Sequence, residues 1–252
     1  MGHSACARAW RAIVIIACGM GWFGPVACAR AGTLDAIHAI LPASPAVAPF
    51  GLAVAPVSSG DLLRKWRAVM RRLEDERVQL ALCDGDRERC ASDAALRFLA
   101  IVDAGRSHEG RARLGQVNRA INLAIHPMSD LAQYGEEDVW SSPLVTFDRG
   151  AGDCEDYAIA KWIALQLAGV AAEDLQIVVL RDAMNGEDHA VTAARLDGHW
   201  LMLDNRRMAM VEDSAVRNYR PLFSIGEAGV MRYSEPPMLA AAPQQDASVA
   251  TP

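Results

Sequence analysis

The sequence of 252 residues lacks a basic excess and has few long apolar runs. Its 25 lysines and arginines are outnumbered by 31 aspartates and glutamates, which gives a net charge of −6. We therefore expect no nucleic-acid partner, because there is no excess of positive charge to neutralise phosphates. Beyond the first thirty residues, no stretch is long and apolar enough to cross a membrane. Hydrophobic residues still make up 52% of the chain, which excludes wholesale disorder and supplies one sizeable core.

The N-terminus has the pattern of a secretory signal peptide. Arg8 and Arg11 precede an apolar run over residues 12–23, and small residues follow it. The tripeptides at 27–29 and 29–31 both fit the small-x-small cleavage pattern. We expect residues 1–29 to be removed and the mature protein to be exported without stable membrane insertion. The alternatives are an uncleaved anchor and a lipoprotein attached through Cys28.

Cysteine is scarce after this expected cleavage. Cys83 and Cys90 are seven positions apart in a polar stretch with a turn-forming Asp-Gly pair. In an oxidising compartment they would close a small loop as a disulfide. The alternative is that both stay reduced, because a disulfide depends on geometry that spacing does not determine. In either case Cys154 has no partner, and an unpaired thiol in an exported protein suggests catalysis.

The mature chain is predicted to have an arm, one folded domain and a tail. Residues 30–60 are rich in Ala, Pro, Val and Gly, which indicates a linker or a loosely docked arm. Residues 234–252 turn to Pro, Ala and Gln, which is typical of a disordered tail. The folded domain is then expected over residues 61–233.

Apolar periodicity within the domain predicts helices first and strands later. Asp61 is the expected N-cap of the first helix. The predicted helices begin at about residue 61 and then cover about 92–104, 110–125 and 154–169. The predicted strands are 175–180, 189–196 and 199–205, with an Asp197-Gly198 hairpin turn between the last two. This order of elements predicts an α+β fold.

Three residues together suggest nucleophilic catalysis. Cys154 begins a helix, whose N-terminal amides stabilise a thiolate. If Asp197-Gly198 is a two-residue turn, each residue of one strand lies opposite the residue of the other whose number brings their sum to 395. His189 and Asp204 are then diagonal neighbours on one face of the hairpin, with Cα atoms about 7–8 Å apart. That arrangement fits a Cys-His-Asp triad of nucleophile, general base and orienting carboxylate. Each residue alone is more often structural, and a register slip by one would separate the pair.

The acids around Cys154 work against a thiolate. Asp153, Glu155 and Asp156 each raise the pKa of a neighbouring thiol unless something neutralises them. The alternative is a solvated acidic helix start, which interacts favourably with the helix dipole without any metal.

The chain resembles the bacterial transglutaminase-like cysteine proteinases, which are calcium-dependent periplasmic proteases that release biofilm adhesins from the outer membrane. The resemblance rests on GDCEDYAIAKW from residue 152, HAV from residue 189 and LDN from residue 203. It spans about residues 61–225 and extends to Trp66, Cys83, Cys90, Gln116-Val117-Asn118 with Asn122, Asp138-Val139-Trp140 and Ser142-Pro143.

The resemblance implies a papain-like and transglutaminase-like α+β fold, in which a helical N-terminal part and a cysteine-headed helix pack on an antiparallel sheet. It implies Cys154 as nucleophile, His189 as base and Asp204 as orienter. It also implies Ca²⁺ bound by Asp153 and Glu155, with Asp156 and Asp138 as further ligands. Because calcium takes six to eight oxygen ligands, the loop of residues 126–152 is expected to supply others.

The resemblance further implies a biological setting. The substrate would be the N-terminal region of a large surface-retained adhesin, and the location would be the periplasm. The inhibitor would be the periplasmic domain of a membrane-bound cyclic-di-GMP receptor. Two other function classes remain open: a transglutaminase or amidase with the same triad, and a non-catalytic calcium-binding adaptor with an idle thiol.

Overall fold

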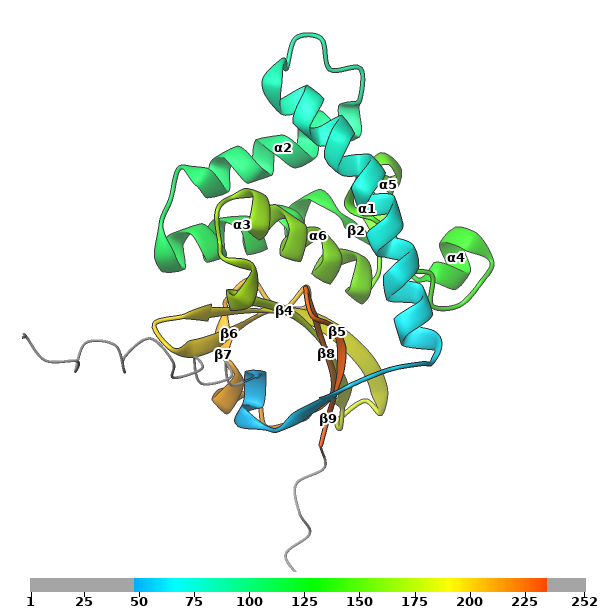
Figure 1. The fold of residues 1–252 in the computed structure, drawn as a ribbon, viewed down its shortest axis with the longest axis vertical. Coiled ribbons are helices and arrows are strands. Elements are labelled where there is room, and N and C mark those ends of the chain that lie inside the picture. The colour runs from blue at the N-terminus through cyan, green and yellow to red at the C-terminus, as the bar shows by residue number, and fades with distance from the viewer. Residues whose placement is uncertain (1–47, 235–252) are drawn as a thin grey trace, which may run out of the picture. The chain divides into compact units, whose positions relative to one another are not determined.

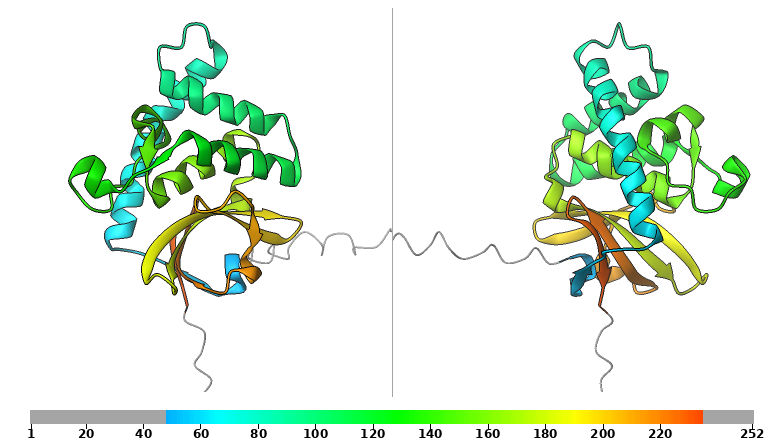
Figure 2. Two further views of the ribbon diagram at one scale, coloured as in Figure 1. Left: turned by 180° about the vertical axis from the view of Figure 1, so that it is seen from behind. Right: turned by 45° about the vertical axis from the view of Figure 1, so that its right-hand side comes forward.

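A helical layer covers one face of a curved antiparallel sheet in the computed structural model, which describes residues 48–234 (Figures 1 and 2). The helices precede most of the strands in the chain, as the α+β prediction requires. The expected signal peptide, residues 1–29, lies outside the described residues, and so does the expected tail of residues 234–252 apart from Ser234. No helix in the part of the chain that the structure describes is both long and apolar enough to cross a membrane.

The helical layer contains the four predicted helices and two short ones. They are α1 (Asp61–Gly85), α2 (Asp93–Arg106), α3 (Gly110–Ala124), α4 (Asp130–Tyr134), α5 (Pro143–Arg149) and α6 (Cys154–Leu167). The predicted cap of the first helix was wrong. The N-cap is Gly60, and Asp61 is instead the first helical residue, with its carboxylate 2.7 Å from the guanidinium of Arg64. Ser92 does cap α2, because its hydroxyl accepts a hydrogen bond from the Ala95 N–H.

The sheet has seven strands in the order β1-β9-β8-β4-β5-β6-β7. Their bounds are β1 (Val54–Pro56), β4 (Leu175–Asp182), β5 (Glu187–Leu196), β6 (His199–Leu203), β7 (Val211–Glu212), β8 (Tyr219–Gly226) and β9 (Gly229–Tyr233). Strand β1 lies within residues 30–60, the expected linker or loosely docked arm, and it pairs with β9 at the edge of the sheet. A separate parallel pair joins β2 (His126–Pro127) to β3 (Ala151–Gly152).

The predicted register of the β5–β6 hairpin is confirmed. Leu196 pairs with His199 and Thr192 with Leu203, so the paired numbers sum to 395. Asp197 and Gly198 form the turn with φ values of 52° and 83°. Positive φ at both central residues is the requirement of the two-residue turn that matches strand twist, and Asp-Gly tolerates it.

Apolar side chains fill two cores, one on each side of the sheet. The larger core lies between the helices and the sheet, and the largest fully buried side chain in it is Trp162 of α6. The smaller core is enclosed by the curvature of the sheet around Val178, Val191 and Met202. Helix α6 packs directly on β4 and β5, so its first residue is held beside the strand that carries His189.

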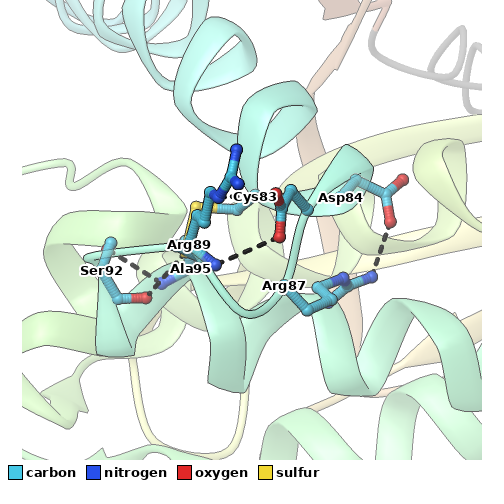
Figure 3. Close-up of a disulfide and its surroundings, with 8 residues drawn as sticks. Cys83, Asp84, Arg87, Arg89, Ser92 and Ala95 are labelled. Atoms are coloured by element: carbon cyan, nitrogen blue, oxygen red, sulfur yellow. Dashed lines mark hydrogen bonds and ion pairs between the residues drawn. A yellow bond between two sulfur atoms is a disulfide. The ribbon is translucent and has the colours of Figure 1, made fainter.

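A disulfide between Cys83 and Cys90 closes the connection from α1 to α2 (Figure 3). The two Cα atoms are 4.8 Å apart, which lies within the usual range for such a bond. Arg87, in the same connection, forms an ion pair with Asp84 at 2.6 Å. Of the two possibilities for Cys83 and Cys90, the structure therefore contains the disulfide and not the two reduced thiols. Cys154 is the free cysteine of the described residues.

Candidate active site

Cys154 lies at the buried start of α6. The residues behind it in this helix, such as Ala158, Ile159 and Trp162, are fully or almost fully buried. This packing fixes the helix, while the cysteine itself keeps some exposure. The thiol therefore combines a rigid support with access from solvent, which a nucleophile needs.

His189 and Asp204 meet as the hairpin register predicts. The Nε2 atom of His189, on β5, is 2.9 Å from Oδ1 of Asp204, which directly follows β6. Both side chains are almost completely buried. The other ring nitrogen, Nδ1, has no hydrogen-bond partner among the described residues. With the Nε2–H donated to the carboxylate, Nδ1 is left as a proton acceptor.

Asp204 is held by further donors. The Tyr219 hydroxyl donates to Oδ2 at 2.8 Å, and the Arg206 N–H donates to Oδ1 at 2.9 Å. Burial by itself raises the pKa of Asp204, but the hydrogen bonds from His189, Arg206 and Tyr219 outweigh it and lower the pKa to about 2. Asp204 therefore stays ionised at neutral pH and fixes the orientation of the imidazole.

The thiol is in surroundings that keep it protonated. Burial raises the pKa of Cys154, and the carboxylates of Glu155 and Asp153 raise it further. The Sγ atom is 3.1 Å from Oε2 of Glu155. A backbone hydrogen bond from Ala190 opposes these effects and places the thiol next to the residue that follows His189. Activation of this thiol therefore requires a base, a cation or both.

Three carboxylates converge beside the helix start. One oxygen from each of Asp130, Asp153 and Asp156 lies within 4.8 Å of the others. The short β2–β3 pair causes this convergence, because it places the main chain just before Asp130 against residues 151–152. Burial, together with repulsion from neighbouring acids, raises the pKa of Asp130 to about 6 and that of Asp156 to about 7.

This cluster has the donor set that calcium prefers. Asp130 Oδ1, Asp153 Oδ1 and Asp156 Oδ2 are buried and have no hydrogen-bond partner among the described residues. Unpaired buried carboxylate oxygens are costly unless a cation or water satisfies them. Calcium binds carboxylate, carbonyl and water oxygens, so these residues fit it.

The predicted ligands divide into two groups. Asp153 and Asp156 belong to the cluster, whereas Glu155 and Asp138 lie outside it. Glu155 contacts the thiol and the carboxyl of Asp153, and burial with the charge of Asp153 raises the pKa of Glu155 to about 9. Asp138 uses Oδ1 to accept from the Trp140 indole at 2.8 Å and Oδ2 to pair with Lys65.

The candidate active site opens to solvent through a cleft of about 540 Å³. Cys154 and His189 both line it, and so do Trp140, Leu222 and Phe223 on its apolar walls. The cleft therefore has a nucleophile candidate, a base candidate and apolar surface for a chain that lies across them.

The sequence alone did not identify Asp130 or Tyr219 as part of this region. The signal for Asp130 was limited to its place in the loop of residues 126–152, which was expected to supply ligands. The hydroxyl of Tyr219 reaches Asp204 only because β8 lies in the same sheet, and no spacing in the sequence indicates that contact.

Comparisons with known proteins bear on the family and the fold. Residues 79–222 match the family model of the bacterial transglutaminase-like cysteine proteinases. The calcium-bound structure of Legionella pneumophila LapG is similar, with a TM-score of 0.50 and 23% identity over 57% of this chain and 82% of that one. The EGTA-treated structure of the same protein gives a TM-score of 0.51 and 22% identity over 63% and 85%. A search of the curated proteins by sequence found no match.

Proposed function

Since the chain belongs to the bacterial transglutaminase-like cysteine proteinases and is a cysteine protease, we propose that Cys154, His189 and Asp204 carry out peptide hydrolysis and that calcium is required. The observation that supports this most strongly is the buried His189–Asp204 pair. In this pair, the Nδ1 atom of His189 has no hydrogen-bond partner among the described residues. His189 lines the same cleft as Cys154.

In the proposed reaction, His189 Nδ1 takes the proton of the Cys154 thiol, and the sulfur attacks the peptide carbonyl carbon. The C–N bond breaks as His189 returns that proton to the leaving amine. Water then hydrolyses the thioester, which releases the carboxylate product and restores the thiol. The Cys154 N–H, at the start of α6, is a donor for the developing oxyanion.

Asp130, Asp153 and Asp156 would hold the calcium ion, with remaining ligands from water or loop carbonyls. A bound divalent cation supplies positive charge that offsets the acids around the thiol and fixes the helix start. This part of the proposal is supported by the unpaired oxygens of the cluster and by the similarity to a LapG structure described as calcium-bound.

The substrate and setting follow from the family resemblance. We place the protein in the periplasm, where it would cleave the N-terminal region of a large surface-retained adhesin. Its inhibitor would be the periplasmic domain of a membrane-bound cyclic-di-GMP receptor. The disulfide between Cys83 and Cys90 is compatible with this oxidising compartment.

The experiment is cleavage of the purified N-terminal region of the cell's own adhesin, here called the adhesin fragment. We expect cleavage by the mature protein in calcium, none in excess EGTA, restoration by calcium but not magnesium, and none by Cys154→Ser with an unchanged circular dichroism spectrum. Knocking out a triad nucleophile typically removes several orders of magnitude in rate. Near-normal cleavage by the serine variant would refute the assignment. Incorporation of an added primary amine in place of hydrolysis would indicate a transglutaminase.

A further inference from the structure

The segment that carries Asp204 leaves the sheet at the end of β6, so the carbonyl groups of Asp204 and of the residues just after it have no strand partner. Its last paired residue is Leu203, and Asp204 and the residues after it form turns. Buried carbonyl groups in such a segment require other donors. Three side chains from the helical layer donate to carbonyl groups in this segment and at the end of β6.

Asn122, near the end of α3, binds two of these carbonyls. Its Nδ2 atom is 3.0 Å from the Asp204 carbonyl oxygen and 3.1 Å from that of Arg207. One amide group thus bridges both ends of the turn, whose own backbone hydrogen bond, from the Arg207 N–H to the Asp204 carbonyl, is 3.4 Å long. Asn118, one helical turn earlier, makes the same kind of contact farther along, to the Met208 carbonyl at 3.2 Å.

Lys161, on α6, binds the carbonyl on the other side of Asp204. Its Nζ atom is 3.1 Å from the Leu203 carbonyl oxygen, and the side chain is fully buried. The sequence has two lysines, Lys65 and Lys161, and uses arginine at every other cationic position. Burial lowers the pKa of Lys161 to about 7, and the nearby charge of Asp204 partly opposes this effect.

We propose that Asn122 and Lys161 are positioning residues that hold the peptide groups on both sides of Asp204, so that its carboxylate faces His189 Nε2. This inference rests on the proposed triad. Neither side chain lines the cleft of Cys154 and His189. Their effect therefore reaches the reaction only through Asp204, and their loss lowers kcat with little change in KM. A shift of about 1 Å in a catalytic group can cost about 10²-fold in rate.

The test combines kinetics on the adhesin fragment in calcium with NMR of the ¹⁵N-labelled imidazole of His189. We expect Asn122→Ala and Lys161→Met each to lower kcat about 10- to 100-fold and to shift the His189 ring signals. Leu123→Ala is the matched control, because this neighbour on α3 is 65% exposed, and it should behave like the wild type. Asn122→Ser keeps a shorter hydrogen-bond donor and should recover part of the activity. This variant also tests the inference if Asn122→Ala fails to fold.

Double variants with Asp204→Asn decide between positioning and general destabilisation. If Asn122 and Lys161 act through Asp204, their substitution should add little to the loss caused by Asp204→Asn, because residues that act as a unit are non-additive. Multiplied losses, unchanged His189 signals or wild-type kcat in the single variants would overturn the inference. Full activity of Asp204→Asn would instead overturn the proposed triad, so the two failures are distinguishable.

Discussion

At the scale of single residues, the environment of Asp204 explains why it can orient a histidine. Its carboxylate accepts from the imidazole, a backbone N–H and the Tyr219 hydroxyl, and these bonds keep its pKa near 2 despite burial. In the proposed reaction, a carboxylate that stays ionised would stabilise the imidazolium formed when His189 takes a proton. Tyr219 also restricts rotation of the carboxylate, because it binds the oxygen that His189 does not use.

Asp204→Asn should fold and bind substrate but turn over slowly. An amide favours the wrong imidazole tautomer, and in the serine triad the corresponding exchange costs about 10⁴-fold in kcat. We expect a smaller loss here, because a thiol ionises more easily than a hydroxyl. The measurement is kcat on the adhesin fragment between about pH 6 and pH 8. Full activity over this range would show that Asp204 is only a turn residue.

The sequence could predict this pair because hairpin pairing is set by a local turn. The Asp197-Gly198 turn determines which residues of β5 and β6 are opposite, and the 2.9 Å contact follows from it. The contacts of Lys161 and Asp130 could not be predicted in the same way. They depend on how α6 packs on the sheet and on a parallel pair of only two residues.

At the scale of elements, the start of α6 is where Cys154, the proposed nucleophile, and the acidic cluster meet. The β2–β3 pair positions Asp130, and Gly152 leaves room for Asp156: a Cβ atom at residue 152 would be 2.8 Å from Asp156 Oδ2. Thr192 of β5 donates to the Ala158 carbonyl at 2.8 Å, which ties α6 to the strand of His189. Loop, helix and strand are therefore coupled at one point.

Two variants test whether calcium binds at the cluster of Asp130, Asp153 and Asp156 and not at the nearby Asp138. Asp130→Asn should weaken calcium binding strongly, because it removes one of the three convergent carboxylates. Asp138→Asn is the matched control and should bind calcium nearly as well, because the Asp138 carboxylate already pairs with Lys65 and Trp140. Isothermal titration of calcium into each metal-stripped variant measures this. Loss of affinity only in the Asp138 variant would contradict the assignment.

Strands β8 and β9 were not among the predicted strands. Pro221 lies inside β8, and proline cannot donate to a ladder, so the sequence argued against a strand there. The structure accommodates it where the β4–β8 register shifts between Val179 and Leu180. Such an irregularity depends on the partner strand, which a single-sequence pattern does not contain.

At the scale of the whole molecule, the acidic cluster couples stability to pH and to calcium. The pKa of Asp130 is raised to about 6 and that of Asp156 to about 7, whereas both groups are near 3.8 when unperturbed. The folded metal-free protein therefore retains protons that the unfolded chain has released. Protonation of Asp130 and Asp156 therefore contributes to the free energy of unfolding of the metal-free protein. This contribution is fully present below about pH 4 and is lost as the pH rises through 6 to 7.

Calcium should consequently stabilise the protein more at about pH 8 than at about pH 5, because protons compete for the same carboxylates. The measurement is the difference in Tm between saturating calcium and EGTA at both pH values. Asp130→Asn should reduce this difference at about pH 8. An equal calcium shift at both pH values would contradict the account.

The central claim is that Cys154 is a nucleophile activated by His189, and its rate of alkylation by iodoacetamide tests this without any substrate. The disulfide protects Cys83 and Cys90, so Cys154 is the thiol of the described residues that reacts. In calcium at about pH 7, we predict alkylation much faster than for an ordinary cysteine, whose pKa is about 8.5. The rate should fall in EGTA and in His189→Ala. Equal, slow alkylation under all three conditions would contradict the account.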